Sequence, residues 1–248
     1  MYGSERRSNK VIGRVRTLHD ASGPVMDAQA PITRIPGVGV PATHLARPAR
    51  FGGALQGDLH CGTLLVAGDR IAGMEADATL SRPSRIVLPG LVEAHVHLDK
   101  CHSVERCTDV GGDLEAAIAA QLRDKALWTE EDLGRRAGRG LSELVAAGCR
   151  VVRTHVDWAT GPAHPSQPLA WDVLGELAAG LAGQGVALQR AALTGIDEMA
   201  EAARAEAVAR IVAASGDVLG SFLLHHADRR AGLRNLFAMA DRFGLALD

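Results

Sequence analysis

The pattern of apolar and polar residues changes twice along the chain. Residues 1–31 show no sustained period and few large apolar side chains, so this segment is expected to be a mobile extension. Residues 32–84 contain short apolar stretches broken by Gly and Pro, which is typical of a small β domain. Within it, Gly68 and Asp69 separate two strand-like runs in TLLVAGDRIAGM, a pattern that predicts a β-hairpin.

From residue 85 onward, apolar strand-like runs alternate with helical segments. The strand-like runs are residues 85–98, 149–158, 186–193, 218–226 and 244–248. The helical segments are residues 129–148, 169–184, 196–214 and 229–243. This alternation predicts a parallel sheet with right-handed crossovers, for which a doubly wound sheet and a β/α barrel are the candidates.

The segment of residues 129–148 illustrates the helical signal. Thr129 is a suitable N-cap residue, and apolar residues follow it at helical spacing from Leu133 to Leu141. Gly148 provides a good C-terminal stop. A helix is therefore expected between the first two strands of the sheet.

Two histidines stand one residue apart at the end of the first run, in LPGLVEAHVHLDK. Residues i and i+2 of a strand face the same side roughly 6–7 Å apart, so His95 and His97 can bind one metal ion at about 2.0–2.1 Å. Val96, between them, is expected to face the packed side. Two structural histidines would give the same spacing, but α/β folds place their chemistry at such strand ends, which favours a metal site.

The motifs around this pair resemble a known family. VLPGLVEAHVHLDK is similar to the first barrel strand of the amidohydrolase superfamily, and HLDK followed by KALWTEEDL and CRVVRTHVD resembles its cytosine deaminase branch. The similarity runs from Ile32 to the last residue. It implies an α/β protein with a partial (β/α)8 TIM barrel of the amidohydrolase type, preceded by a small β domain. Residues 85–248 would form about four and a half β/α units, the first half of a barrel that takes about 250 residues when whole. The chain is thus expected to be an N-terminal portion truncated within the barrel.

The resemblance implies a metal-dependent hydrolase acting on C–N bonds. His95 and His97 would be two ligands of one divalent metal ion, zinc or iron, which activates a water by lowering its pKa towards 7. The expected reaction is hydrolytic deamination of a cytosine-like or related nitrogen heterocycle. Binuclear members of the superfamily resemble one another in a modified lysine on the fourth strand, whereas the lysines here are Lys10, Lys100 and Lys125, so a single metal is expected.

Five further side chains are candidates for the substrate pocket. They are Asp99, His155, Asp157, His225 and His226. Asp99 follows the histidine pair, and the resemblance suggests that His155 and Asp157 face the active-site end, with a structural hydrogen-bonded pair as the alternative. Of the adjacent His225 and His226, one must point inward if both belong to the fourth strand.

The chain departs from the family in two places. Cytosine deaminases read the pyrimidine with a glutamine in a third strand similar to LQ…FPQEG, whereas this chain continues LQRAALTGIDE and has Gly195 there. Because glycine lacks the amide's paired donor and acceptor, a triazine or another heterocycle is as good a candidate as cytosine. The family's fifth strand, similar to LDVHCDE, brings a third metal ligand and a general acid, but this sequence ends in FGLALD. The chain alone is therefore expected to be inactive.

Two other hypotheses stay open at this point. One is a non-catalytic half-barrel fragment that serves as a binding or assembly module. The other is a complete doubly wound protein with structural histidines, although the long connection from Asp99 to Cys149 suits a barrel loop better. Exposed strand edges of an unclosed barrel favour association, so a homo-oligomer or association through those edges is expected.

Composition narrows the classes of partner. The chain has 27 Lys and Arg against 29 Asp and Glu, a balance that would steer neither nucleic acid nor an anionic membrane. No apolar run approaches the ~20 residues of a transmembrane helix, and the basic start is too polar for a signal peptide. The four cysteines form no C-x-x-C pair, which favours a reducing compartment, and a cytoplasmic location is expected. A small nitrogen heterocycle is the expected partner.

Overall fold

The computed structural model describes residues 31–107, 110–158, 167–224 and 227–248. The chain divides into two compact units, Met1–Pro89 and Gly90–Asp248. The division follows Pro89 rather than residue 84, because Arg85 and Ile86 pair with a strand of the first unit. Apart from Pro31, the expected mobile extension lies outside the described residues. The assignment of the units as separate domains stays a prediction.

The first unit is a small β-sheet. Its elements are β1 (Ile32–Pro41), η1 (Ala42–His44), α1 (Pro48–Phe51), β2 (Ala54–Gln56), β3 (Leu59–Ala67), β4 (Arg70–Glu75) and β5 (Arg85–Ile86). The strand order is β2-β3-β1-β5, with β4 paired to β3. The turn between β3 and β4 uses Gly68 with a φ of 59°, so the predicted hairpin is confirmed. Val38, Val40, Leu64 and Met74 form the core of this unit.

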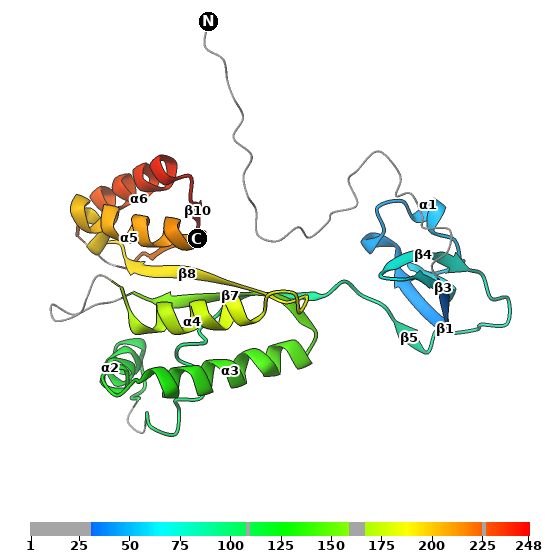
Figure 1. Cartoon of the computed structure of the whole chain (residues 1–248), viewed down its shortest axis with the longest axis horizontal. Coiled ribbons are helices and arrows are strands. Elements are labelled where there is room, and N and C mark those ends of the chain that lie inside the picture. Colours follow the sequence, from blue (N-terminus) through cyan, green and yellow to red (C-terminus); the bar gives the residue numbers. More distant parts are fainter. Residues whose placement is uncertain (1–30, 108–109, 159–166, 225–226) are drawn as a thin grey trace, which may run out of the picture. The chain divides into compact units, whose positions relative to one another are not determined.

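The second unit is a parallel sheet with helices between its strands (Figure 1). Its strands are β6 (Leu91–Val96), β7 (Cys149–Asp157), β8 (Ala187–Gly195), β9 (Val218–Phe222) and β10 (Ala246–Leu247). Its helices are α2 (Leu114–Lys125), α3 (Glu130–Ala146), α4 (Leu169–Gly180), η2 (Glu198–Ala200), α5 (Ala202–Ser215) and α6 (Arg229–Phe243). All the strand pairs are parallel.

The strand order distinguishes the two architectures that the sequence left open. The order is β10-β9-β8-β7-β6, so every crossover leads to the next strand on the same side. Right-handed crossovers that always step in one direction place all the helices on one face, as in a barrel. A doubly wound sheet reverses direction at a switch point instead. The predicted partial barrel is confirmed, and the doubly wound alternative is wrong.

The sheet is strongly curved, as part of a barrel must be. Strands lie about 4.7–4.9 Å apart, so β7 and β10, with β8 and β9 between them, would be roughly 14 Å apart in a flat sheet. Nevertheless, His155 Nε2 of β7 lies 2.9 Å from Asp248 Oδ1, directly after β10. The face that carries these two side chains is therefore the concave one.

The opposite face of the sheet packs against the helices. Val152 and Val156 of β7 are fully buried in one apolar cluster with Leu133 and Leu141 of α3. The predicted cap of α3 is confirmed, because Thr129 Oγ1 accepts a hydrogen bond from the backbone amide of Asp132 at 3.2 Å. Alternate residues of β7 thus pack against the helices, and the others face the concave side.

Helix α2 was not predicted, although a signal for it was present. Leu114, Ile118 and Leu122 recur at a helical spacing of four, and Asp113 caps the helix by accepting a hydrogen bond from the amide of Ala116 at 2.8 Å. The three apolar side chains are exposed, however. The helix is held instead by polar contacts at its C-terminal end, where Arg106 binds the buried carboxylate of Asp124.

Several strands and helices differ in extent from the prediction. β6 begins at Leu91 rather than at residue 85, and β9 ends at Phe222 rather than at residue 226. The expected helix of residues 196–214 starts at Ala202, because the preceding residues form the turn η2. Among the described residues, no helix is long and apolar enough to cross a membrane.

Two helical glycines differ in the space around them, and this difference allows a test of how closely α6 approaches the rest of the unit. A Cβ on Gly232 would lie 1.9 Å from the carbonyl oxygen of Ile196, whereas a Cβ on Gly134 of α3 would meet only Val173 Cγ1, at 3.9 Å. Gly232→Ala should therefore lower the free energy of unfolding by about 1–3 kcal/mol. Gly134→Ala should raise it by up to about 1 kcal/mol, since alanine favours helix. Urea unfolding of both variants checks this, and equal effects would contradict the close approach of α6.

Candidate functional site

His95 and His97 lie side by side at the carboxyl end of β6. Their ring centroids are 5.3 Å apart, and the planes are inclined by 73°. Val96 between them packs against the apolar cluster under the helices, so the two imidazoles face the concave side. The alternation expected of a strand is present, and it brings the two predicted ligands together.

A hydrogen bond determines which nitrogen of His97 is free. His97 Nδ1 lies 3.0 Å from the backbone oxygen of His155, which can only accept, so Nδ1 carries the proton. Burial lowers the pKa of His97 to about 4, assisted by the nearby charge of Lys100. The ring is therefore neutral at physiological pH and has a lone pair on Nε2. Metal-binding histidines are oriented in this way, by donating the other ring nitrogen to a carbonyl or carboxylate.

The spacing of the pair suits a shared metal ion. Two imidazoles bound at about 2.0–2.1 Å to one tetrahedral ion have ring centroids roughly 5 Å apart. The observed separation of 5.3 Å agrees. Within the described ranges, no group of three or more His, Cys, Asp and Glu side chains is placed to hold a metal ion. His95 and His97 thus fit as two members of a ligand set.

His155 occupies the concave face beside this pair. It is 1% exposed, and its ring stacks on that of His95 with a centroid distance of 3.9 Å. Its Nε2 bonds Asp248 Oδ1 at 2.9 Å, and Asp248 Oδ2 accepts a hydrogen bond from Arg153 Nη1 at 2.6 Å. Arg153 Nε in turn donates to Gln189 Oε1 at 2.7 Å. A hydrogen-bonded chain therefore crosses the concave face and ends at the histidines.

Within this series of hydrogen-bonded side chains, the carboxylate of Asp248 carries the negative charge. Burial is the largest influence on its pKa and raises it, but the hydrogen bonds from His155 and Arg153 together prevail and lower the pKa. Asp248 is thus ionised at neutral pH and only accepts hydrogen bonds. Since its partner on His155 is Nε2, that nitrogen carries the proton.

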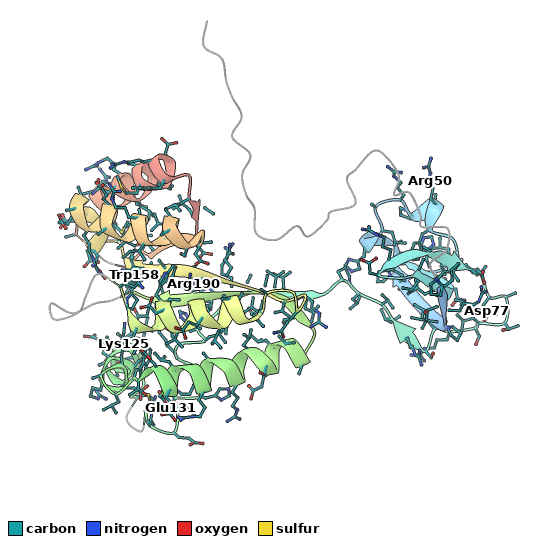
Figure 2. All side chains as sticks on the ribbon, in the orientation of Figure 1. Arg50, Asp77, Lys125, Glu131, Trp158 and Arg190 are labelled. Carbon is teal, nitrogen blue, oxygen red and sulfur yellow. The ribbon has the colours of Figure 1, made fainter. Side chains whose placement is uncertain are left out.

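Asp99 and Asp157 lie close together at the carboxyl end of β7. Asp99 is fully buried, and its Oδ2 accepts a hydrogen bond from the amide of Asp157 at 3.2 Å. Burial raises the pKa of Asp99 to about 6. Lys100 Nζ and Lys125 Nζ each lie 3.7 Å from Asp157 Oδ2. Figure 2 shows Lys125 and Trp158 at this same end of the sheet.

Three positions singled out from the sequence remain, namely His225, His226 and Gly195. His225 and His226 fall outside the described residues. Gly195 ends β8, and a Cβ there would lie 2.6 Å from Asp197 Oδ1, so any larger side chain requires Asp197 to move.

Sequence reasoning missed Arg153, Gln189 and Asp248 as members of the site. Arg153 carried a signal, because it precedes His155 by two residues on the same strand, as His95 precedes His97. No sequence signal marked Asp248 as a member of the site, since its contact with β7 depends on the curvature of the sheet.

Comparison with known proteins identifies several relatives of this chain. No family model matches the chain. The chain is 30% identical over 164 residues to a pterin deaminase of Rhizobium rhizogenes strain K84, a match that covers 66% of this chain and 36% of that protein. The 5-methylcytosine deaminase of Klebsiella pneumoniae liganded with 5-fluorocytosine superposes with a TM-score of 0.57 and 25% identity. These similarities indicate the deaminase branch of the amidohydrolase superfamily.

A second solved structure of the superfamily agrees. N-isopropylammelide isopropylaminohydrolase of Burkholderia multivorans also has a TM-score of 0.57 and 25% identity to the chain. Both superpositions cover 87% of this chain but only 50% and 52% of the two solved proteins. The resemblance drawn from HVHLDK and RTHVD to the deaminase branch of the superfamily is confirmed. The chain spans about half the length of its solved relatives.

Proposed function

We propose that this chain supplies part of the active site of a metal-dependent hydrolase that deaminates a nitrogen heterocycle. The observation that carries the proposal is the hydrogen bond from His97 Nδ1 to the carbonyl of His155. It leaves Nε2 of His97 available beside His95, at the strand end where barrels place their chemistry. The relatives support the class of reaction, because two of them are deaminases and the third is an aminohydrolase.

His95 and His97 would hold one divalent ion, zinc or iron, through neutral imidazole nitrogens. When bound, such an ion supplies a nucleophile by lowering the pKa of a water molecule towards 7. A single ion is supported by β9, the fourth strand of the barrel, which contains no lysine from Val218 to Phe222.

The protein's own groups suggest where a substrate would lie. Asp157 and its lysine partners stand at the carboxyl end of β7, where barrel enzymes bind substrate. Asp157 stays a pocket candidate, and so do His225 and His226. Asp99 is fully enclosed and contacts the backbone amide of Asp157, so it would support the pocket from beneath.

The proposed substrate is a cytosine-like or related small nitrogen heterocycle. The names of the relatives refer to pterin, 5-methylcytosine and N-isopropylammelide, which are heterocycles of this kind. Gly195 supplies no side chain to read a pyrimidine, and Asp197 lies close to the space a side chain would need. A pocket without the glutamine amide that cytosine deaminases use loses discrimination for cytosine. A non-catalytic half-barrel is not favoured, because the relatives are enzymes.

Two further proposals concern the setting of the protein. All four cysteines are free, which supports a reducing compartment and hence a cytoplasmic location. Within the described part of the chain, β6 and β10 each pair with a strand on one side, so their other edges are open to association. We expect a homo-oligomer or association through these edges.

Assays of ammonia release test the proposed function. The chain would be assayed alone and with a segment that supplies the remaining barrel strands, against 5-methylcytosine, cytosine, pterin and an alkylamino-triazine. Turnover is expected only with the added segment, in the presence of zinc or iron, and not after chelation, because two imidazoles bind an ion weakly. Equal ammonia release by the chain alone, or turnover that survives chelation, would contradict the proposal.

A further inference from the structure

His155 contacts both proposed metal ligands, and it does so through two different groups. Its ring stacks on His95, with 3.9 Å between centroids and 23° between planes. Its backbone oxygen accepts the hydrogen bond from His97 Nδ1 at 3.0 Å. The position of this one residue of β7 therefore affects the orientation of both imidazoles on β6.

Within the described part of the chain, the ring of His155 is held by a single hydrogen bond. Its Nδ1 is buried and has no hydrogen-bond partner among the described residues, whereas Nε2 donates to Asp248 Oδ1 at 2.9 Å. Arg153 holds the other oxygen of Asp248 at 2.6 Å and is fixed in turn by Gln189. Rotation of the ring would break this hydrogen bond to Asp248 at a buried site, which is costly.

Small residues on the intervening strands allow this contact. Ala191 of β8 is paired with His155 in the sheet register, and Gly220 lies on β9. A Cβ on Gly220 would be 3.5 Å from Asp248 Cβ and 2.8 Å from the carbonyl oxygen of Ala192. A side chain at Gly220 would therefore crowd Asp248 and the neighbouring strand. The concave face is therefore shaped so that Asp248 can reach across two strands.

We infer that His155 is a positioning residue for the metal-binding pair, held in place by Asp248 and Arg153, and that it is not a substrate-pocket residue. The inference rests on the proposed function, in which His95 and His97 bind the ion. Outer-shell partners of metal-binding histidines typically change metal affinity by about 10–100-fold. Asp248 bonds to His155 and not to the metal-binding pair. Replacing Asp248 should therefore change the metal affinity only when the imidazole of His155 is present.

Calorimetric titration of the full chain with Zn²⁺ tests this dependence. Asp248→Asn and His155→Phe should each lower the affinity about 10-fold or more. Phenylalanine keeps the stacked ring and the backbone carbonyl but removes the nitrogen that bonds Asp248. In the double variant the affinity should equal that of His155→Phe, because Asp248 acts through His155. Two exposed controls, His44→Ala and Asp241→Asn, should bind Zn²⁺ as the unmodified chain does.

A second measurement separates positioning from folding. The ¹⁵N shifts of the His97 ring without metal should report the Nδ1-protonated tautomer in the unmodified chain and a mixture of tautomers in Asp248→Asn. The midpoint of thermal unfolding shows whether a variant is folded, and Arg153→Gln replaces His155→Phe if that variant is not. A loss of zinc affinity with a changed tautomer in a folded variant supports the inference.

The possible failures are distinguishable. If the unmodified chain binds Zn²⁺ through His95 and His97 while Asp248→Asn and His155→Phe bind it equally well, only the positioning role is overturned. If zinc binding is unaffected by His95→Ala and His97→Ala, the proposed metal site is wrong, and the positioning role falls with it. Additive losses in the double variant would show that Asp248 does not act through His155.

Discussion

Replacing His95 or His97 by alanine is expected to abolish metal binding and deamination together, in a protein that carries this chain with the remaining strands of the barrel. Each variant removes one imidazole of a pair whose rings, 5.3 Å apart, suit a shared ion. The loss of zinc affinity should exceed the roughly 10–100-fold effect of removing an outer-shell partner. Zinc titration and ammonia release, measured on the same preparations, check the prediction.

The control for these variants is His44→Ala, which removes an exposed histidine of the first unit. It should leave both readouts unchanged. If His95→Ala or His97→Ala retained full metal content and turnover, the catalytic ion would have to be bound by other residues. A loss of turnover with metal content intact would assign the histidine a role other than that of a ligand.

The substitution Asp132→Asn is expected to destabilise the protein by about 3–5 kcal/mol, the range for breaking a buried ion pair on one side. Asp132 of α3 is bonded by Arg106 Nη1 and Arg136 Nε, both at 2.9 Å. Arg136 is 4% exposed, so the variant leaves its guanidinium largely buried without a counter-charge. Arg136 Nη1 also donates to the carbonyls of Asp99 and Cys101. The turn after His97 should therefore loosen as well.

The stability difference should depend on pH in a defined direction. Burial is the largest influence on the pKa of Asp132 and raises it, but the hydrogen bonds and charges of Arg106 and Arg136 together lower it below the ordinary value of 3.8. A lowered pKa means that the stabilisation is present above the ordinary pKa and is lost as the pH falls through the lowered one. The difference between the chain and Asp132→Asn should be largest near pH 7 and shrink in acid.

Urea unfolding at neutral and acidic pH measures this difference. The matched control is Glu143→Gln on the same helix, where Glu143 pairs with Arg139 and both side chains are more than half exposed. Its effect should stay below about 1 kcal/mol, as for other exposed ion pairs. Equal effects of the two variants, or a pH-independent effect of Asp132→Asn, would contradict the role assigned to the buried pairs.

Features that depend on neighbours along the chain could be predicted before the fold was known. The cap at Thr129, the extent of α6 and the hairpin at Gly68 follow from local hydrogen bonds and periodicity, and all were predicted. The alternation of His95, Val96 and His97 also follows from a local rule, since strand side chains alternate between faces. Motifs at these positions were sufficient to indicate the superfamily.

Contacts that cross the sheet or join distant segments could not be predicted in this way, because they form only in the folded protein. Arg153 and Asp248 are 95 residues apart and meet only because the sheet curves, which no spacing rule encodes. Likewise, β5 joins β1 rather than extending β6, although its sequence reads as part of one apolar run. Burial distinguished two carboxylates that looked alike: Asp99 is enclosed beneath the amide of Asp157, while Asp157 contacts two lysines. The reason is physical, because both burial and curvature are set by packing between elements that the chain brings together only when folded.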